Sequence, residues 1–292
     1  MKSSNQNLKA KLEKITKNLG RLFGFDGKIS PYFWEISEKG EFTAKKILLT
    51  NEVWDLKSLE KISLEDFLNW LENRKKLYGQ HDSKYYQLID ILQSHLSDLQ
   101  IYRAYYVDEV FRIYTGKTKD NNYFALCEPF PELNQLGCYP NAYKDTSDKF
   151  LIPDIPNNEA SISIVQDLEF NKFKVTKGFS GSDDVYMWEM AETEDLAVEK
   201  VLASAKFLIT HDFNGFVNLG NSVNIELTAW NEIEEELQDD YKELELFLLQ
   251  ELTNQRVYII GTPLHNKFDI YVLGNDSDND WAGILINVEF IA

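Results

Sequence analysis

Hydrophobic and polar residues alternate toward the C-terminal end of the chain in the way expected of antiparallel strands. β-Branched and aromatic residues form three runs there, at 257–260, 268–273 and 281–286. Clusters of glycine, proline, asparagine and aspartate separate the runs, and these are the residue types that turns of a β-meander use. The pattern therefore predicts consecutive antiparallel strands over 255–290.

An earlier part of the chain repeats this order of residue types. Matching residues lie 156 to 158 positions apart: Tyr102 and Tyr258, Tyr114 and Tyr271, Asp120 and Asp278. A Tyr-x-Trp-Glu segment at 32–35 also matches one at 186–189, with an offset of 154. One-residue insertions in loops produce such a drift, so the sequence predicts an internal duplication.

Apolar residues at spacings of three and four predict amphipathic helices ahead of each meander. The strongest helix is predicted over 232–252, and a matching one over 83–99. Four apolar positions of the two helices correspond with an offset of 156: Tyr85 and Tyr241, Leu88 and Leu244, Leu92 and Leu248, Leu96 and Leu252. A further helix is predicted over 7–22, whereas the start of the second copy at 162–165 is ambiguous.

Proline marks a break between the two copies. Residues 128–158 hold five of the seven prolines of the chain, which is typical of a linker or an irregular connection. A chain of 292 residues is long enough for two domains with separate cores. We expect an α+β protein with a first domain over 1–130, a proline-rich linker over 131–158 and a second domain over 159–292.

Composition places the chain among globular proteins, with 43% hydrophobic and 13% aromatic residues. No apolar run approaches the roughly 20 residues of a membrane span. The first residues lead into a charged helix without the apolar core of a signal peptide, so a cytoplasmic location is expected. Cys127 and Cys138 could pair, and two reduced thiols are the expectation in a reducing compartment.

Charge divides unevenly between the two halves of the sequence. Residues 1–150 carry 22 Lys and Arg against 21 Asp and Glu, a net charge of +1, whereas 151–292 carry 8 against 27, a net charge of −19. Such a field repels the phosphates of nucleic acids and speeds encounters with basic proteins. The sequence therefore predicts a basic protein partner and no direct nucleic-acid binding. Acidity that served solubility alone would be spread over both halves.

Residue types with catalytic potential are few. Among the four histidines, His211 beside Asp212 is the most suggestive, but no second histidine stands at metal-ligand spacing from it. Asp276, Asp278 and Asp280 share the first spacings of a calcium loop and lack its turn glycine and its final glutamate. We therefore expect a non-enzymatic protein with no cofactor and no metal.

With these anchors in place, each half resembles the nuclease A inhibitor family, small proteins that block a sugar-non-specific nuclease. The residues that carry the resemblance are the Trp-Glu strands at 34–35 and 188–189 and the closing pattern over 257–284. The resemblance implies two tandem α-β-α sandwich domains, each with a largely antiparallel central sheet. It also implies inhibition through an acidic loop ahead of the Trp-Glu strand and through the C-terminal residues.

The resemblance and the charge pattern together give the candidate partner-binding residues. Asp26 in the first copy, and Asp183 and Asp184 in the second, lie nearest to the acidic loop of the family. The tail contains Glu289 and ends apolar at Ala292, where the family pattern is polar and acidic. The other candidates are acids of the predicted helix at 232–252: Glu232, Glu234, Glu235, Glu236, Asp239 and Asp240.

The favoured interpretation is a protein-binding module that docks a basic protein, with a nuclease among the candidates, through the acidic second domain and without a membrane. An immunity protein that neutralises a different toxin is the first alternative. An enzyme with a site between the two copies, containing His211 and nearby acids, is the second alternative.

Overall fold

The computed structural model describes residues 3–17, 19, 21–22, 25–26, 28–53, 56–78, 83–106, 109–129, 157–178, 184–205, 207–216, 219, 235–261 and 267–289. The chain folds into two compact units, and each unit takes segments from both halves of the sequence. Unit 1 contains Met1–Phe42, Cys138–Leu151 and Phe207–Ala292, and unit 2 contains Thr43–Gly137 and Ile152–Lys206. No described helix is long and apolar enough to cross a membrane.

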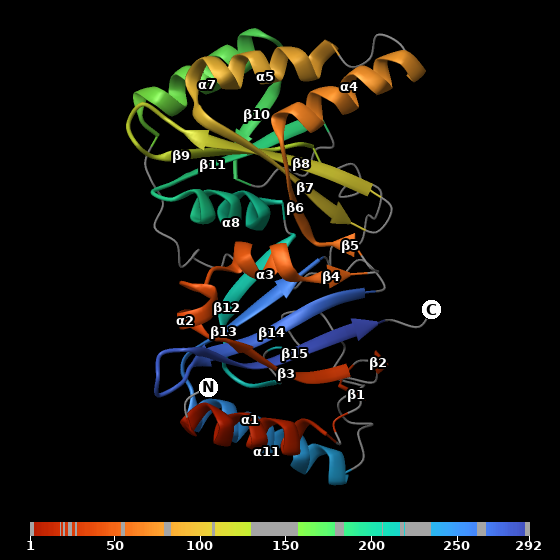
Figure 1. Cartoon of the computed structure of the whole chain (residues 1–292), viewed down its shortest axis with the longest axis vertical. Helices are drawn as coiled ribbons and strands as arrows, with labels where there is room; N and C mark the ends of the chain where they lie inside the picture. The colour runs from red at the N-terminus through yellow and green to blue at the C-terminus, as the bar shows by residue number, and fades with distance from the viewer. Residues whose placement is uncertain are drawn as a thin grey trace. The chain divides into compact units, whose positions relative to one another are not determined.

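Unit 1 is built on a five-stranded antiparallel sheet with the order β12-β13-β14-β15-β3 (Figure 1). Strands β13, β14 and β15 are the meander predicted from the sequence. Helices α1 and α11 lie side by side on one face of this sheet. The described elements of unit 1 are α1 (Ser3–Thr16), β1 (Arg21–Leu22), β2 (Phe25–Asp26), β3 (Lys28–Trp34), α2 (Ile36–Lys39), β12 (Leu208–Asp212), α11 (Glu235–Glu251), β13 (Thr253–Ile260), β14 (Lys267–Asn275) and β15 (Trp281–Glu289).

Unit 2 is built on a six-stranded sheet with the order β10-β11-β9-β8-β7-β6. Only β10 and β11 pair in parallel among the described strands of this sheet. Helices α4, α5 and α7 cover one face and α8 covers the other (Figure 1). The described elements of unit 2 are α3 (Ala44–Thr50), β4 (Glu52–Val53), β5 (Leu56–Lys57), β6 (Leu59–Ile62), α4 (Leu64–Tyr78), α5 (Ser83–His95), β7 (Ser97–Tyr106), β8 (Glu109–Lys117), β9 (Tyr123–Cys127), α7 (Glu159–Phe170), β10 (Lys174–Lys177), β11 (Val185–Ala191) and α8 (Glu194–Ser204).

Each unit has its own hydrophobic core between its helices and its sheet, and the predicted α+β class with largely antiparallel sheets is confirmed. In unit 1, Leu12 of α1 packs in one cluster with Leu248 of α11 and Ile284 of β15. In unit 2, Leu168 of α7 packs in one cluster with Leu92 of α5. All of these side chains are fully buried, and burying a leucine or isoleucine side chain contributes about 1.5–3 kcal/mol.

The first helix and strand of each half lie against the meander of the other half. β3, from the first half, pairs with β15 of the second half, and β11, from the second half, pairs with β9 of the first half. The compact units therefore differ from the contiguous domains expected over 1–130 and 159–292. The repeat in the sequence is contiguous, whereas the folded units are made by exchange of α1–β3 and α7–β11 between the copies.

Strand register shows which residues of the two copies are equivalent. Phe33 of β3 lies opposite Ala282, and Met190 of β11 lies opposite Phe124, the equivalent of Ala282 in the other meander. β3 and β11 therefore correspond with an offset of 157. The Tyr-x-Trp-Glu match at an offset of 154 is wrong by three residues, because Trp188 occupies the place of Pro31, not of Trp34.

The two meanders share details that the sequence repeat indicates. Leu96 and Leu252 each precede a β-bulge with a left-handed residue, Asp98 (φ 54°) and Asn254 (φ 52°). A Cβ atom at Gly116 or at Gly274 would come within 2.9 Å of that leucine. The neighbouring strand therefore requires glycine at this position in both copies.

The ambiguous start of the second copy is helix α7, which pairs with α5 in unit 2. Its N-terminus is a capping box, in which the Asn158 side chain accepts a hydrogen bond from the Ser161 amide at 2.9 Å and Ser161 Oγ accepts one from the Asn158 amide at 3.1 Å. Capping supplies partners for amides that the helix leaves unpaired. The apolar stripe of α7 is short, so the cap is the clearer start signal.

Candidate functional site

One end of the unit 1 sheet brings together the two segments that the family resemblance associates with inhibition. β2 lies beside β15, as Figure 1 shows. Asp26 is in β2 and Glu289 is the last residue of β15. Lys28, two residues after Asp26, pairs with Asn287, two residues before Glu289. The first half thus supplies Asp26 to the sheet end at which the second half supplies Glu289.

A row of polar residues crosses three strands at this end of the sheet. Asp269 of β14, Asn287 of β15 and Lys28 of β3 are register partners. The Asn287 amide donates to Asp269 Oδ1 at 2.6 Å, and Asp269 is only 5% exposed. Burial, followed by the Asp269 and Tyr32 side chains, raises the pKa of Tyr271, so its phenol stays protonated. The row gives this end a buried carboxylate with a fixed hydrogen-bond donor.

The opposite end of the same sheet face is aromatic and closed. The Phe42 ring stacks on Trp281 at 4.4 Å between centroids and meets Trp34 and Tyr258 edge-on. Trp34 is 4% exposed, and its Nε1 donates to the Gly40 carbonyl at 2.9 Å. Trp34 therefore packs within the fold, and Trp188, 5% exposed, is likewise buried.

The aspartates of the β14–β15 turn bind backbone amides. Asp276 Oδ1 accepts from the Asp278 and Asp280 amides at 2.8 and 3.0 Å. Asp280 Oδ1 accepts from the amide of Ile36, the first residue of α2, at 2.8 Å. The described residues contain no group of histidine, cysteine, aspartate or glutamate side chains placed to hold a metal ion. The turn interpretation of this loop is supported over a calcium loop.

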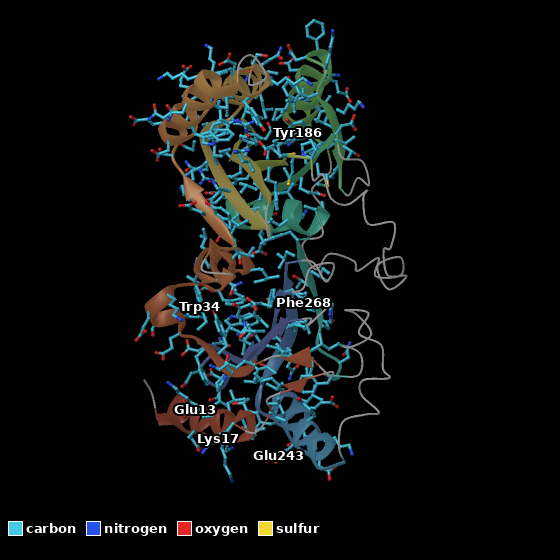
Figure 2. The ribbon with its side chains drawn as sticks, turned by 90° about the vertical axis from the view of Figure 1, so that its right-hand side faces the viewer. Glu13, Lys17, Trp34, Tyr186, Glu243 and Phe268 are labelled. Carbon is cyan, nitrogen blue, oxygen red and sulfur yellow. The ribbon has the colours of Figure 1, made fainter. Side chains whose placement is uncertain are left out.

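The outward side of α11 is acidic with exposed leucines. Tyr241, Leu244, Leu248 and Leu252 face the core, as the spacing predicted. Leu246 is 55% exposed and Leu249 is 41% exposed. The exposed residues of this outer strip are Asp239, Lys242, Glu243, Leu246, Leu249 and Gln250. Figure 2 shows Glu243 in the helical layer of unit 1. We call these residues the α11 strip.

Lysines of α1 partly neutralise the negative charge of α11. The exchange places α1, from the first half of the sequence, beside α11, from the second half. Lys11 Nζ lies 3.0 Å from Glu251 Oε1 and 5.8 Å from the centroid of the Phe247 ring. By sequence, unit 1 has 13 Lys and Arg against 23 Asp and Glu, and unit 2 has 17 against 25. The net charges of −10 and −8 replace the +1 and −19 of the sequence halves.

The equivalent end of unit 2 has different chemistry. Asp184 forms an exposed ion pair with Lys174 of β10. Glu128, just after β9, accepts from the Tyr114 hydroxyl at 2.6 Å and from Arg112 Nη1 at 3.1 Å. The guanidinium of Arg112 lies 4.0 Å from the centroid of the Trp70 ring. Arg112 and Glu128 are both buried, and their ion pair lies in the core beneath α4 and α5.

A second polar cluster joins α3 to α8 within unit 2. Lys45 Nζ lies 2.9 Å from Glu194 Oε1 and 3.0 Å from Asp195 Oδ1, and the Tyr102 hydroxyl donates to Glu194. Glu199 Oε1 accepts from the Lys45 amide at 3.1 Å. Burial raises the pKa of Glu199 to about 7, and the amides of α3 partly oppose this shift.

The remaining reactive groups do not assemble a catalytic site among the described residues. His211 is half-buried on β12, and its Nδ1 lies 2.9 Å from the carbonyl oxygen of Asp212. His95 Nε2 pairs with Asp167 at 2.6 Å between α5 and α7. Cys127 is a free, buried thiol, and burial and Glu128 raise its pKa. Such a thiol is a weak nucleophile.

Several predicted site residues lie outside the description. Asp183, Glu232, Glu234 and Ala292 are outside the described residues. Glu235, Glu236 and Asp240 lie in α11, and of these only the helix position is described. Asp239 is exposed and its Oδ1 lies 3.3 Å from Lys242 Nζ. The structure thus brings Asp26 and Glu289 to one sheet end and assigns Asp184 to unit 2.

The model of the nuclease A inhibitor-like protein family matches residues 6–126 and 184–289. The chain belongs to this family. No curated protein matches the chain. The second matched segment starts at Asp184, one residue before β11, which agrees with the weak sequence signal of α7. Two matched segments support the duplication, and membership makes a nuclease-inhibitor-like, protein-binding role the general expectation.

Sequence reasoning missed the polar row and the lysines beside α11. Asp269 and Asn287 stand within apolar strands, and only their register makes them neighbours. The alternation of residues along β15 indicates that Asn287 lies on the sheet face away from the helices, and this pattern could have pointed to the polar row. No signal within the contiguous copies places Lys11 beside Glu251, because 239 residues separate them.

Proposed function

We propose that this member of the nuclease A inhibitor-like family is a protein-binding module that docks a basic protein, with a nuclease as the first candidate, through unit 1. The observation that carries the proposal is the α11 strip, where Leu246 and Leu249 are exposed among acids. Exposed apolar side chains rimmed by charge are typical of protein interfaces. The acids would steer a basic partner, and the leucines would hold it.

The sheet end with Asp26 and Glu289 is the second contact of the proposal. Family resemblance implies that an acidic loop and the C-terminal residues approach the metal and catalytic site of a nuclease. In this chain β2, with Asp26, comes from the first half, and the end of β15, with Glu289, comes from the second half; the two strands lie side by side in unit 1. The acidic docking surface is therefore assigned to a composite unit, not to the second sequence half alone.

The proposal is tested by binding of the full chain to a sugar-non-specific, metal-dependent nuclease immobilised on a sensor. Reversing charge in the α11 strip, with Asp239→Lys and Glu243→Lys together, should slow association about tenfold at low salt and reduce its salt dependence. The matched control reverses exposed Glu159 and Glu169 of α7 in unit 2 and should change the rate less than about twofold.

Two results would contradict the proposal. One is equal slowing by the control, which would mean that net charge and not the α11 strip acts. The other is the absence of binding both to that nuclease and to any basic protein captured from native lysate at low and at high salt. Leu246→Ser separates the apolar contribution, because it should speed dissociation and leave the association rate unchanged.

A further inference from the structure

The two exchanged helix pairs differ sharply in charge. α1 has three lysines and one glutamate, and it lies against α11, which has seven acids and one lysine. α7 has three acids and no lysine or arginine, and it lies against α5, whose charged residues are Lys84, Asp90 and His95. In each pair, therefore, the more acidic helix has a cationic or near-neutral neighbour.

Side-chain contacts follow this complementarity. In unit 1, Lys11 pairs with Glu251 at 3.0 Å. In unit 2, His95 Nε2 pairs with Asp167 Oδ2 at 2.6 Å, and Gln87 Nε2 donates to Asn171 Oδ1 at 2.7 Å. Each contact joins a helix of one sequence half to a helix of the other half.

The backbone alone does not select the exchanged arrangement. β3 and β11 have seven residues each and take the same register in their sheets, so each could geometrically replace the other. Pairing within contiguous copies would put α7 against α11, a layer with ten acids and one lysine. Like charges at helix-neighbour distances destabilise a pairing, and such repulsion against a competing arrangement gives specificity.

We propose that the two halves of this chain are obligate binding partners of each other, and that the lysines of α1 select the acidic α11 as their docking surface. The covalent connection between the halves is then dispensable for the folded state. The sheet end that combines Asp26 with Glu289 exists only while both halves are associated. The proposal concerns assembly of the units and does not rest on the proposed partner.

The first experiment cuts the folded full chain at a specific protease site inserted between Gly137 and Cys138. Each compact unit contains strands from both fragments, so the cut chain should elute as one species with both fragments in equal amounts. Only denaturant should separate them. Separation of two folded fragments in native buffer would overturn the proposal, because contiguous domains would behave in this way.

The second experiment measures how charge on α1 affects fragment association in the cut chain. Replacing Lys9, Lys11 and Lys14 by glutamate should raise the dissociation constant of the fragments at least about tenfold at low salt. Added salt should then tighten association of the variant fragments and weaken that of the unchanged fragments. The control replaces three exposed lysines of unit 2 that lie outside the α5–α7 pair, at positions 61, 75 and 76, and should change the constant less than about twofold.

A charge swap between Lys11 and Glu251 provides a second test in case the triple variant folds poorly. Lys11→Glu alone should weaken association about threefold, and adding Glu251→Lys should restore it, because the ion pair is re-formed with reversed polarity. An unchanged salt dependence in the triple variant, or equal weakening by the control, would show that charge on α1 does not select α11.

Discussion

Glu199 is a buried carboxyl group whose protonation is coupled to folding of unit 2. Its side chain faces the first amides of α3, and the charged groups nearest to it are Asp195 and Lys45. Burial raises its pKa from 4.5 to about 7. The folded protein therefore binds this proton more tightly than the unfolded chain does. The resulting stability is fully present below about pH 4.5 and is lost as the pH rises through about 7.

We predict that Glu199→Gln removes this pH dependence. Between pH 5 and pH 8 the free energy of unfolding of the unchanged protein should fall relative to that of the variant. The full shift in pKa corresponds to a fall on the order of 3 kcal/mol. Glutamine still offers an acceptor to the Lys45 amide. Urea unfolding of both proteins at several pH values measures the difference. Parallel curves over this range would contradict the assignment.

Glycine positions show how far single residues could be predicted from the sequence. Gly116 and Gly274 recur with the repeat, and both contact the preceding bulge closely, so the repeat itself pointed to them. Gly283 has no glycine equivalent, because the other copy has Ala125 at this position. A Cβ at Gly283 would meet the Val272 carbonyl oxygen at 2.0 Å, a constraint that depends on the local path of β15.

At the scale of elements, the sequence predicted where the strands lie better than it predicted which residues of the two copies are equivalent. The meander and the apolar stripe of α11 were predicted with their equivalents, but the Tyr114–Tyr271 match is wrong by one residue. Tyr114 lies opposite Ile101, whereas Tyr271 lies opposite Tyr258, the equivalent of Tyr102. The Trp-Glu match is wrong because the identical residues do not occupy equivalent positions in the two strands. Trp34 ends β3 on the face away from α1 and packs on Phe42, whereas Trp188 lies in the helix-facing core and stacks on Phe124. Only strand pairing distinguishes these two faces.

The equivalent strands also differ in the cores that they build. Arg112 and Glu128 of unit 2 correspond to Ile270 and Ile286 of unit 1, which are fully buried. Arg112 Nε has no hydrogen-bond partner, and the Arg112–Glu128 ion pair is buried. Desolvation of a buried pair offsets much of its attraction, but loss of one partner leaves an uncompensated charge.

We predict strongly non-additive effects at this pair. Glu128→Ile alone should destabilise unit 2 by about 3–5 kcal/mol, because it leaves Arg112 buried without its carboxylate. Adding Arg112→Ile, which reproduces the residues of unit 1, should recover at least about half of that loss. Thermal and urea unfolding of both single variants and of the double variant complete the cycle. Additive losses would show that the aromatic rings around Arg112, and not the ion pair, dominate.

At the scale of the whole molecule, the sequence predicted the duplication and the family but not the exchange. Residues equivalent in the two copies can form the same contacts within a copy or between copies, and the repeat pattern is identical in both cases. The charge asymmetry of the halves predicts one acidic domain. Exchange divides the charge almost evenly between the units, so under the proposed function the acidity that would steer a partner is local, in the α11 strip.

The exchange itself predicts which strands each N-terminal helix stabilises. Leu12 of α1 and Leu168 of α7 are equivalent and fully buried. Leu12→Ala should destabilise unit 1 by about 2–5 kcal/mol. Amide hydrogen exchange in β13–β15, in the other sequence half, should then speed up at least about 30-fold where it needs opening of the unit. Exchange in β7–β9 should be unchanged.

Leu168→Ala is the matched control, because the same structure predicts the opposite pattern for it. It should speed hydrogen exchange in β7–β9 of the first sequence half and leave β13–β15 protected, since Leu168 packs with Leu92 and Leu126. Contiguous domains would reverse both results: Leu12→Ala would then affect β7–β9, and Leu168→Ala would affect β13–β15. The pair of variants therefore distinguishes the two arrangements in the uncut chain, whatever partner the protein binds.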